Sequence, residues 1–105
     1  MLLNKIRDAL KDTNIFWQKH SLQRMLERNI SRAEVKEALQ NGMVIEEYLN
    51  DYPFPSILIA YLDGLYPLHE VASWDKGSDM CYIITAYMPD EKHFEPDLIT
   101  RKNDE

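Results

Sequence analysis

The first 42 residues repeat their apolar positions at helical spacing, whereas the residues after Gly42 form extended apolar runs. Apolar residues recur every three or four positions over residues 2–12 and again over residues 17–28, which predicts two amphipathic helices. In the second helix, Leu22 and Met25 belong to the apolar stripe, and the opposite side carries charged residues and a histidine.

A third helix is predicted from Ser31 by a local capping motif. Ser31 and Glu34 have the spacing of a capping box, in which each side chain accepts a hydrogen bond from the other residue's main-chain amide. Ile30 and Val35 flank this pair as a hydrophobic staple. We expect Gly42 to end the helix by adopting a left-handed conformation.

Four extended runs follow, over residues 43–48, 57–62, 66–74 and 80–88, and turn-forming residues separate them. This order predicts an antiparallel meander of four strands. The residues after Pro89 are expected to form a loop with a short turn over residues 97–101. The whole chain, residues 1–105, is therefore predicted to be one α+β domain, with its N-terminal helices packed on a four-stranded antiparallel sheet.

A two-residue turn at Asp63 and Gly64 would pair Leu58 with His69, and the next hairpin would pair His69 with Thr85. One face of the sheet then carries His69, Ile83, Thr85 and Tyr87, and the other carries Glu70, Tyr82 and Ile84. A shift of one residue would exchange the two faces. The prediction that depends least on the register is that His69, Thr85 and Tyr87 share a face.

The charge is unevenly distributed over a chain of 105 residues with a net charge of −6. Residues 1–42 contain eight Lys or Arg and five Asp or Glu, whereas residues 43–105 contain four and thirteen. The acidic part suits a basic protein partner and repels RNA, whereas a cationic surface is expected only in the N-terminal part. No apolar run is long enough to span a membrane and no export signal is present, so we expect a cytoplasmic protein without a membrane partner.

His20, Arg24 and Arg28 follow one another at intervals of four residues on the predicted second helix. Two guanidinium groups and an imidazole on one helix face suit phosphate binding or phosphodiester chemistry. The alternative is an ordinary solvated helix face, in which Glu27 pairs with one of the arginines.

His69 lies in the middle of a predicted strand between apolar residues, so it is either a hydrogen-bonded structural residue or part of a wet cleft. Tyr87 is a candidate partner for it in both cases. His93 lies in an acidic tail and is interpreted as a solvated side chain, and Cys81 as a small core residue. One cysteine and three separated histidines, with no glycine-rich phosphate loop, predict neither a metal site nor a cofactor.

Short motifs occur in a fixed order along the chain: HSLQRMLERNIS at residues 20–31, VIEEY at 44–48, DYPFPS at 51–56, PLH at 67–69 and ITAYMPD at 84–90. Together they resemble the small bacterial family designated domain of unknown function 4258, over about residues 15–101. Ser21, Asn29 and Glu70 stand where that family has Ala, Gly and Val. Glu70 therefore places a charge at an apolar position of the family.

The resemblance implies a fold similar to that of RelE- and ParE-type toxins and a gene context beside a small antitoxin. Its motif positions in this chain are His20, Arg24, Arg28, Ser56, His69, Tyr87 and Asp90. The first hypothesis is a metal-independent endoribonuclease of the toxin type. His69 or His20 would act as the general base, the other imidazole or Tyr87 as the general acid, and Arg24 with Arg28 would stabilise the phosphorane.

Two other functions stay open from the sequence. The acidic C-terminal part favours a non-catalytic module that binds a basic protein such as an antitoxin. In the third interpretation the domain is stable and its histidines are only structural. The ribonuclease hypothesis predicts that His20, Arg24, Arg28 and His69 lie together in the fold, with Tyr87 beside them.

Overall fold

The computed structural model describes residues 1–102 and contains three helices and five strands in these residues. The helices are α1 (Leu2–Lys11), α2 (Lys19–Glu27) and α3 (Arg32–Asn41). The strands are β1 (Ile15–Trp17), β2 (Met43–Tyr48), β3 (Ser56–Tyr61), β4 (Leu68–Asp75) and β5 (Met80–Tyr87). The α+β class and the helices at residues 2–12 and after Ser31 are thus confirmed.

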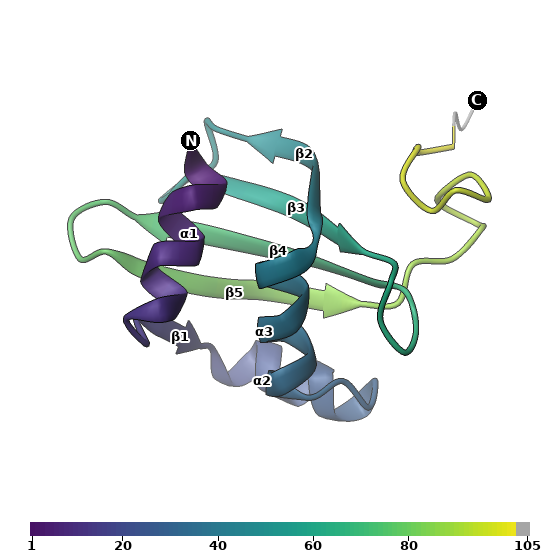
Figure 1. The fold of residues 1–105 in the computed structure, drawn as a ribbon, viewed down its shortest axis with the longest axis horizontal. Coiled ribbons are helices and arrows are strands. Elements are labelled where there is room, and N and C mark those ends of the chain that lie inside the picture. The colour runs from purple at the N-terminus through teal and green to yellow at the C-terminus, as the bar shows by residue number, and fades with distance from the viewer. Residues whose placement is uncertain (103–105) are drawn as a thin grey trace.

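The strands form one mixed sheet in the order β1-β5-β4-β3-β2 (Figure 1). Strands β2 to β5 form the expected antiparallel meander, but β1 adds a fifth strand that runs parallel to β5. The prediction of four strands was therefore incomplete. Trp17 ends β1 and does not begin the helix, because residues 15–17 pair with residues 81–83.

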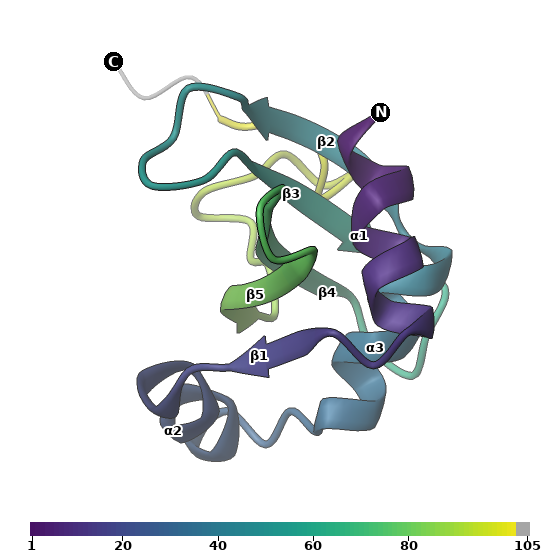
Figure 2. The same ribbon diagram turned by 90° about the vertical axis from the view of Figure 1, so that its left-hand side faces the viewer.

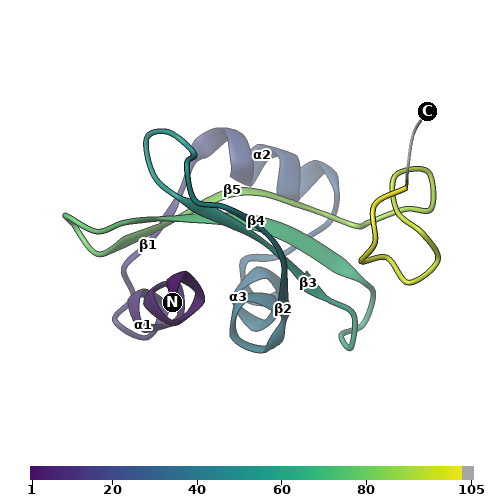
Figure 3. The ribbon, with the colours of Figure 1, turned by 90° about the horizontal axis from the view of Figure 1, so that it is seen from above.

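Helices α1 and α3 cover one face of the sheet, and α2 lies on the other side, alongside β5 (Figures 2 and 3). The core fills the space between the sheet and helices α1 and α3. It is built from Ile6, Val35 and Leu39 of the helices and from Ile57, Ile59 and Ile83 of the strands, all with no exposed surface. We call the face of the sheet opposite α1 and α3 the open face.

The start of α3 agrees with the prediction, and its end does not. The Ser31 hydroxyl accepts a hydrogen bond from the Glu34 amide, and a Glu34 carboxylate oxygen accepts one from the Ser31 amide. Gly42, however, has an extended conformation with φ −78°. A Cβ atom there would lie 2.5 Å from Ile59 Cγ2 and 2.6 Å from the Ala38 oxygen, so lack of space requires this glycine.

The register of the central strands differs from the expected one by two residues. His69 pairs with Ala60, because the loop between β3 and β4 spans residues 62–67 and is longer than a two-residue turn. It pairs with Tyr87, because Met80 pairs with Asp75 instead of Trp74 and because β5 contains one extra residue. A shift of two residues preserves the faces, so His69, Thr85 and Tyr87 do share the open face.

A bulge in β5 reverses two of the predicted side-chain positions. Val71 pairs with Thr85 and Ala72 with Ile83, which leaves Ile84 as the extra residue. Because of this extra residue, Ile83 belongs to the core under the helices, and Tyr82, paired with Ser73, lies on the open face. Both positions were predicted the other way round.

Glu70 lies on the helix-covered face and has no exposed surface. Within residues 1–102 neither of its carboxyl oxygens has a hydrogen-bond partner. Burial without a partner raises the pKa of Glu70 well above its ordinary value, which favours the neutral acid over the carboxylate inside the core. Glu70, which the sequence shows as a charged residue, therefore lies in an apolar environment.

The residues after β5 return to the open face of the sheet. Phe94 is buried against His69, and residues 94 and 101 form an isolated antiparallel bridge. Between them, the Asp97 carboxylate accepts hydrogen bonds from the amides of Ile99 and Thr100, which forms the turn expected over residues 97–101. No helix within residues 1–102 has the length and apolar character needed to cross a membrane.

Candidate active site at the end of β5

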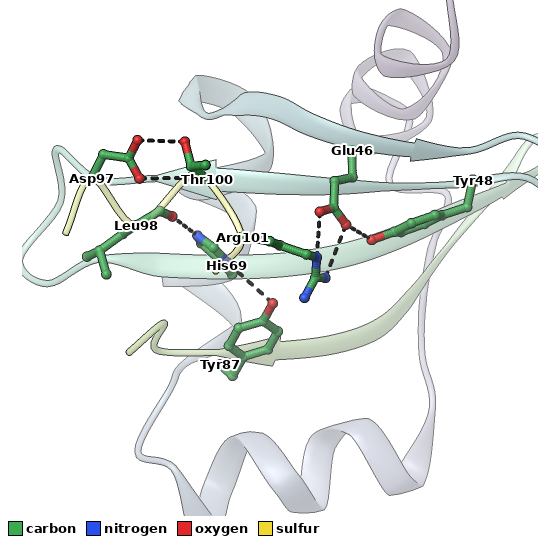
Figure 4. Close-up of polar contacts among 8 residues, drawn as sticks. All are labelled: Glu46, Tyr48, His69, Tyr87, Asp97, Leu98, Thr100 and Arg101. Carbon is green, nitrogen blue, oxygen red and sulfur yellow. Dashed lines mark hydrogen bonds and ion pairs between the residues drawn. The ribbon is translucent and has the colours of Figure 1, made fainter. Parts of the chain in front are cut away.

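His69 and Tyr87 lie opposite each other on β4 and β5 and form the centre of the site (Figure 4). The Tyr87 hydroxyl is 3.3 Å from His69 Nδ1, and the Leu98 carbonyl oxygen is 2.7 Å from Nε2. A carbonyl only accepts hydrogen bonds, so Nε2 carries the proton of a neutral ring. Nδ1 is then the acceptor and the Tyr87 hydroxyl the donor.

The surroundings of His69 favour this neutral form. The imidazole has no exposed surface, and the Phe94 ring meets it edge-on at a centroid distance of 4.6 Å. Burial lowers the pKa of His69 from its ordinary value, although the hydrogen bond to the Leu98 carbonyl acts in the opposite direction. His69 is therefore available as a base at neutral pH, and its Nδ1 contacts the partly exposed Tyr87.

A second polar group, Glu46, Tyr48 and Arg101, borders this pair on the β2 side (Figure 4). Arg101 binds the Glu46 carboxylate through two nitrogens, at 2.6 and 3.1 Å, and Tyr48 donates to the same carboxylate. The guanidinium lowers the pKa of Glu46, and the carboxylate raises that of Arg101. This ion pair holds Arg101 beside the Phe94 ring, 5.1 Å from its centroid.

Tyr87 and Arg101 line a pocket of about 340 Å³ at the end of β5. Its other walls come from residues that follow the strand: Met88, Pro89, Asp90, His93 and Phe94. His93 Nδ1 lies 2.9 Å from an Asp90 carboxylate oxygen, and this hydrogen bond lowers the pKa of Asp90. The pocket thus contains a hydroxyl backed by a buried base, an imidazole oriented by a carboxylate, and a guanidinium.

These groups can carry out acid–base chemistry on an anionic substrate. Tyr87 with His69 can accept a proton, His93 with Asp90 can donate one, and Arg101 can stabilise negative charge. Within residues 1–102, no three His, Cys, Asp or Glu side chains are close enough to share a metal ion. Cys81 is buried in the core, as expected, and burial raises the pKa of its thiol to about 12.

The helix stripe lies beside this site and is not part of its hydrogen-bond network. Arg28 donates to the Ala86 carbonyl at 2.9 Å and approaches the Thr85 hydroxyl at 3.4 Å, which anchors α2 to the edge of β5. Arg24 pairs with Glu27 at 3.9 Å, and both side chains are more than half exposed. In residues 1–102 no hydrogen bond joins His20 or Arg24 to His69.

Of the residues predicted for the site, the structure joins only His69 and Tyr87 directly. Thr85 and Tyr87 point to the same face, so Arg28 approaches that face two residues along β5 from Tyr87. His20 and Arg24 are exposed on α2. The expected single cluster is thus arranged as a pair in the sheet and a stripe along its border.

Comparison with protein families identifies one match, to a domain of unknown function, DUF4258, over residues 17–88. The match covers more than half of the chain. The chain belongs to this family. No curated protein and no solved structure matches it. The part that matches DUF4258 contains His20, Arg24, Arg28, His69 and Tyr87, whereas Asp90, His93 and Arg101 follow it.

Arg101 and the part that His93 plays in the pocket were not predicted from the sequence. His93 is exposed, as interpreted, but it also pairs with Asp90 and lines the same pocket as Tyr87. The alternation of Glu46 and Tyr48 along β2 was an available signal, since residues two apart in a strand share a face. Arg101 follows an irregular segment outside the DUF4258 match and had no such signal.

Proposed function

We propose that this DUF4258 protein is a metal-independent endoribonuclease of the toxin type, acting in the cytoplasm and paired with an antitoxin. The observation that supports the proposal is the convergence of Tyr87, His93 and Arg101 on one pocket. Cleavage of RNA without a metal needs a base for the ribose 2′-hydroxyl, an acid for the leaving oxygen and a cation for the phosphorane. The pocket contains one group for each task.

The proposed reaction begins when the 2′-hydroxyl transfers its proton to the Tyr87 oxygen as the Tyr87 proton moves to His69 Nδ1. The 2′-oxygen then forms a bond to phosphorus, and the bond from phosphorus to the 5′-oxygen breaks. His93 donates the proton that the departing 5′-oxygen requires. The products are a 2′,3′-cyclic phosphate and a 5′-hydroxyl, and proton exchange with water restores both imidazoles.

The other residues support these steps by position and charge. Asp90 orients His93 through the hydrogen bond to its Nδ1, and the Leu98 carbonyl stabilises the protonated His69 ring. Arg101, held by Glu46, faces the pocket where the phosphorane charge develops. The proposal also takes the helices and the sheet to be a variant of the RelE-type toxin fold.

A second candidate is a non-catalytic module that binds a basic protein. It is favoured by a pocket of about 260 Å³ between α3 and the β3–β4 loop, lined by Glu34, Glu37, Tyr61 and Tyr66 with the exposed Leu65 at its rim. Carboxylates beside aromatic rings suit a lysine or arginine side chain. This pocket shares no lining residue with the pocket of Tyr87 and is compatible with either function.

Incubation of the purified protein with a labelled RNA in the presence of EDTA tests the ribonuclease proposal. We expect cleavage products with 2′,3′-cyclic phosphate ends. His93→Asn should lower the rate by about 10²-fold or more, because it removes the general acid. Lys36→Gln, which removes one exposed charge on α3, is the matched control and should leave the rate unchanged. Absence of cleavage by the wild-type protein would contradict the proposal and favour the binding module.

A further inference from the structure

An aromatic row crosses the open face of the sheet at the beginning of β5. Phe54, from the β2–β3 loop, stacks on Tyr82 with a centroid distance of 5.4 Å and an angle of 8° between the rings. Phe16 of β1 continues the row on the other side of Tyr82, at 5.6 Å. Phe16 is 50% exposed, and none of the three rings belongs to the core under the helices. The row is therefore a surface feature built from three separate segments.

From this row, a strip of partly exposed residues follows β5 to the candidate active site. Ile84, at the bulge, is 40% exposed and lines a small pocket of about 140 Å³ together with Phe54 and Val71. Thr85 comes next, and Tyr87 at the end of the strand lines the pocket that contains Arg101 and His93. The aromatic row and the proposed reaction site are thus the two ends of one strip along a single strand.

Helix α2 borders the same strip and carries its positive charge. Residues 19–28 contain three cations, Lys19, Arg24 and Arg28, and one acidic residue, Glu27. The Arg28 contacts with Thr85 and Ala86 hold the helix against β5, so Arg24 and His20 extend along the border one helical turn apart. Although the whole chain is acidic, this border is cationic.

We propose that this strip is a binding track for single-stranded RNA. The bases stack on Phe16 and its row, the phosphates lie along the α2 stripe, and the backbone enters the pocket of Tyr87. This inference rests on the proposed ribonuclease function and names its substrate class. Aromatic rings beside a cationic border are typical of single-strand binding, because an unpaired base offers its face for stacking. A duplex keeps its bases stacked on one another and cannot use the row.

The track can be tested by fluorescence anisotropy with a labelled 2′-O-methyl oligouridine. This probe lacks the free 2′-hydroxyl, so it binds without being cleaved. We expect Phe16→Leu to weaken binding about five-fold or more and Phe16→Trp to retain it, because only the second keeps an aromatic face. Met43→Ala, which shortens an apolar side chain that is 52% exposed at the start of β2, is the matched control and should bind as the wild type does.

The contacts between phosphates and the α2 stripe are tested separately, by the salt dependence of binding. Arg24→Gln should weaken binding and reduce the slope of log affinity against log salt by about one, whereas Phe16→Leu should leave this slope unchanged. Circular dichroism and thermal unfolding of each variant check that the fold is retained. The same binding measurement is made with two further probes, a deoxyoligonucleotide of matching sequence and an RNA duplex. Comparable binding of the duplex would overturn the assignment to single strands, and tighter binding of the deoxyoligonucleotide would overturn the assignment to RNA.

Different results would contradict the proposed binding track and the proposed ribonuclease function. Wild-type affinity in Phe16→Leu, or no binding of the probe by the wild type at low salt, overturns the track even if RNA is cleaved. Binding that follows these expectations without cleavage of unmodified RNA overturns the ribonuclease proposal and leaves the track. Capture of a protein at the strip, with no affinity for the probe, also overturns the track.

Discussion

The Tyr87 hydroxyl donates to Nδ1 of His69 across adjacent strands, at 3.3 Å, and thereby connects a fully buried imidazole to a surface pocket. The second nitrogen of the imidazole is engaged by the Leu98 carbonyl. In the proposed reaction, His69 would therefore act on the substrate through Tyr87 and not by direct contact. This arrangement has consequences for both activity and stability.

Tyr87→Phe should reduce RNA cleavage by about 10²-fold or more while leaving the fold intact, because it removes the oxygen that accepts the 2′-proton. In the wild type, the rate should fall at acidic pH as His69 becomes protonated, and Tyr87→Phe should remove this dependence. Rate against pH for both proteins, with unfolding by denaturant as the control for the fold, measures the effect. Equal pH profiles would assign His69 a purely structural role.

The pKa of His69 also predicts how stability changes with pH. Since burial lowers the pKa of the folded form below the ordinary value of 6.5, the unfolded chain binds more protons as the pH falls through 6.5. The stability that His69 contributes is therefore complete above pH 6.5 and is lost progressively below it. His69→Gln should flatten this part of a plot of unfolding free energy against pH, whereas an unchanged slope would contradict the neutral buried ring.

The parts of the fold that could be predicted from the sequence depend on neighbouring residues. All determinants of the α3 cap lie between Ile30 and Val35, and the shared face of His69 and Tyr87 survives a register error of two because the period of a strand is two. Strand β1 could not be predicted in this way. It has three residues, and its pairing with residues 81–83 is a long-range contact without a local signal.

In the candidate site, too, the residues with a local sequence pattern could be predicted and those held by long-range contacts could not. His69 was predicted as a site residue because it is an imidazole inside an apolar strand, and Tyr87 because it is a neighbour on the same face. Arg101 reaches Glu46, which is 55 positions earlier in the chain, from a segment with no periodic pattern. The bulge at Ile84 has the same character, since one unpaired residue decides whether Tyr82 faces the helices or the open face.

Replacement of Glu70 should stabilise the protein. Glu70→Leu removes a buried carboxyl group without a hydrogen-bond partner and should raise the free energy of unfolding at pH 7 by about 1–3 kcal/mol. Glu70→Gln is the matched control, because it removes the ionisable group but keeps a buried polar side chain. Chemical denaturation of the three proteins at one pH measures the difference. A destabilised Glu70→Leu would indicate that the carboxyl group has a partner in solution.

The contribution of Glu70 to the free energy of unfolding changes with pH in the opposite direction to that of His69. Because the folded pKa of Glu70 is raised, the unfolded chain loses its proton first as the pH rises above 4.5. The wild type should therefore lose stability relative to both Glu70 variants as the pH rises from 4.5. Measuring the His69 effect in a Glu70→Leu background separates the two contributions.

Ser31→Ala should destabilise the protein by about 1 kcal/mol, since it removes the acceptor for the Glu34 amide at the start of α3. Ser31→Asp should retain most of the stability, because a carboxylate also caps a helix and interacts favourably with its dipole. Neither change should alter RNA cleavage, because the cap is not part of the pocket of Tyr87. Equal denaturation midpoints for Ser31→Ala and the wild type would show that the cap contributes nothing measurable.

Gly42→Ala should destabilise the protein, although the substitution adds only one methyl group. The added methyl group would lie 2.5 Å from Ile59 Cγ2, 2.6 Å from the Ala38 oxygen and 2.9 Å from the Ala60 oxygen, and the last two are main-chain atoms that cannot rotate away. The junction of α3 and β2 must then shift from β3, which we expect to cost about 1–3 kcal/mol. Gly77→Ala is the matched control, because the nearest atom to its added methyl group is an Asp75 carboxylate oxygen at 3.4 Å. If both variants unfold at the same denaturant concentration, the close packing of Gly42 against β3 is absent in solution, and the glycine is then required by neither space nor backbone conformation.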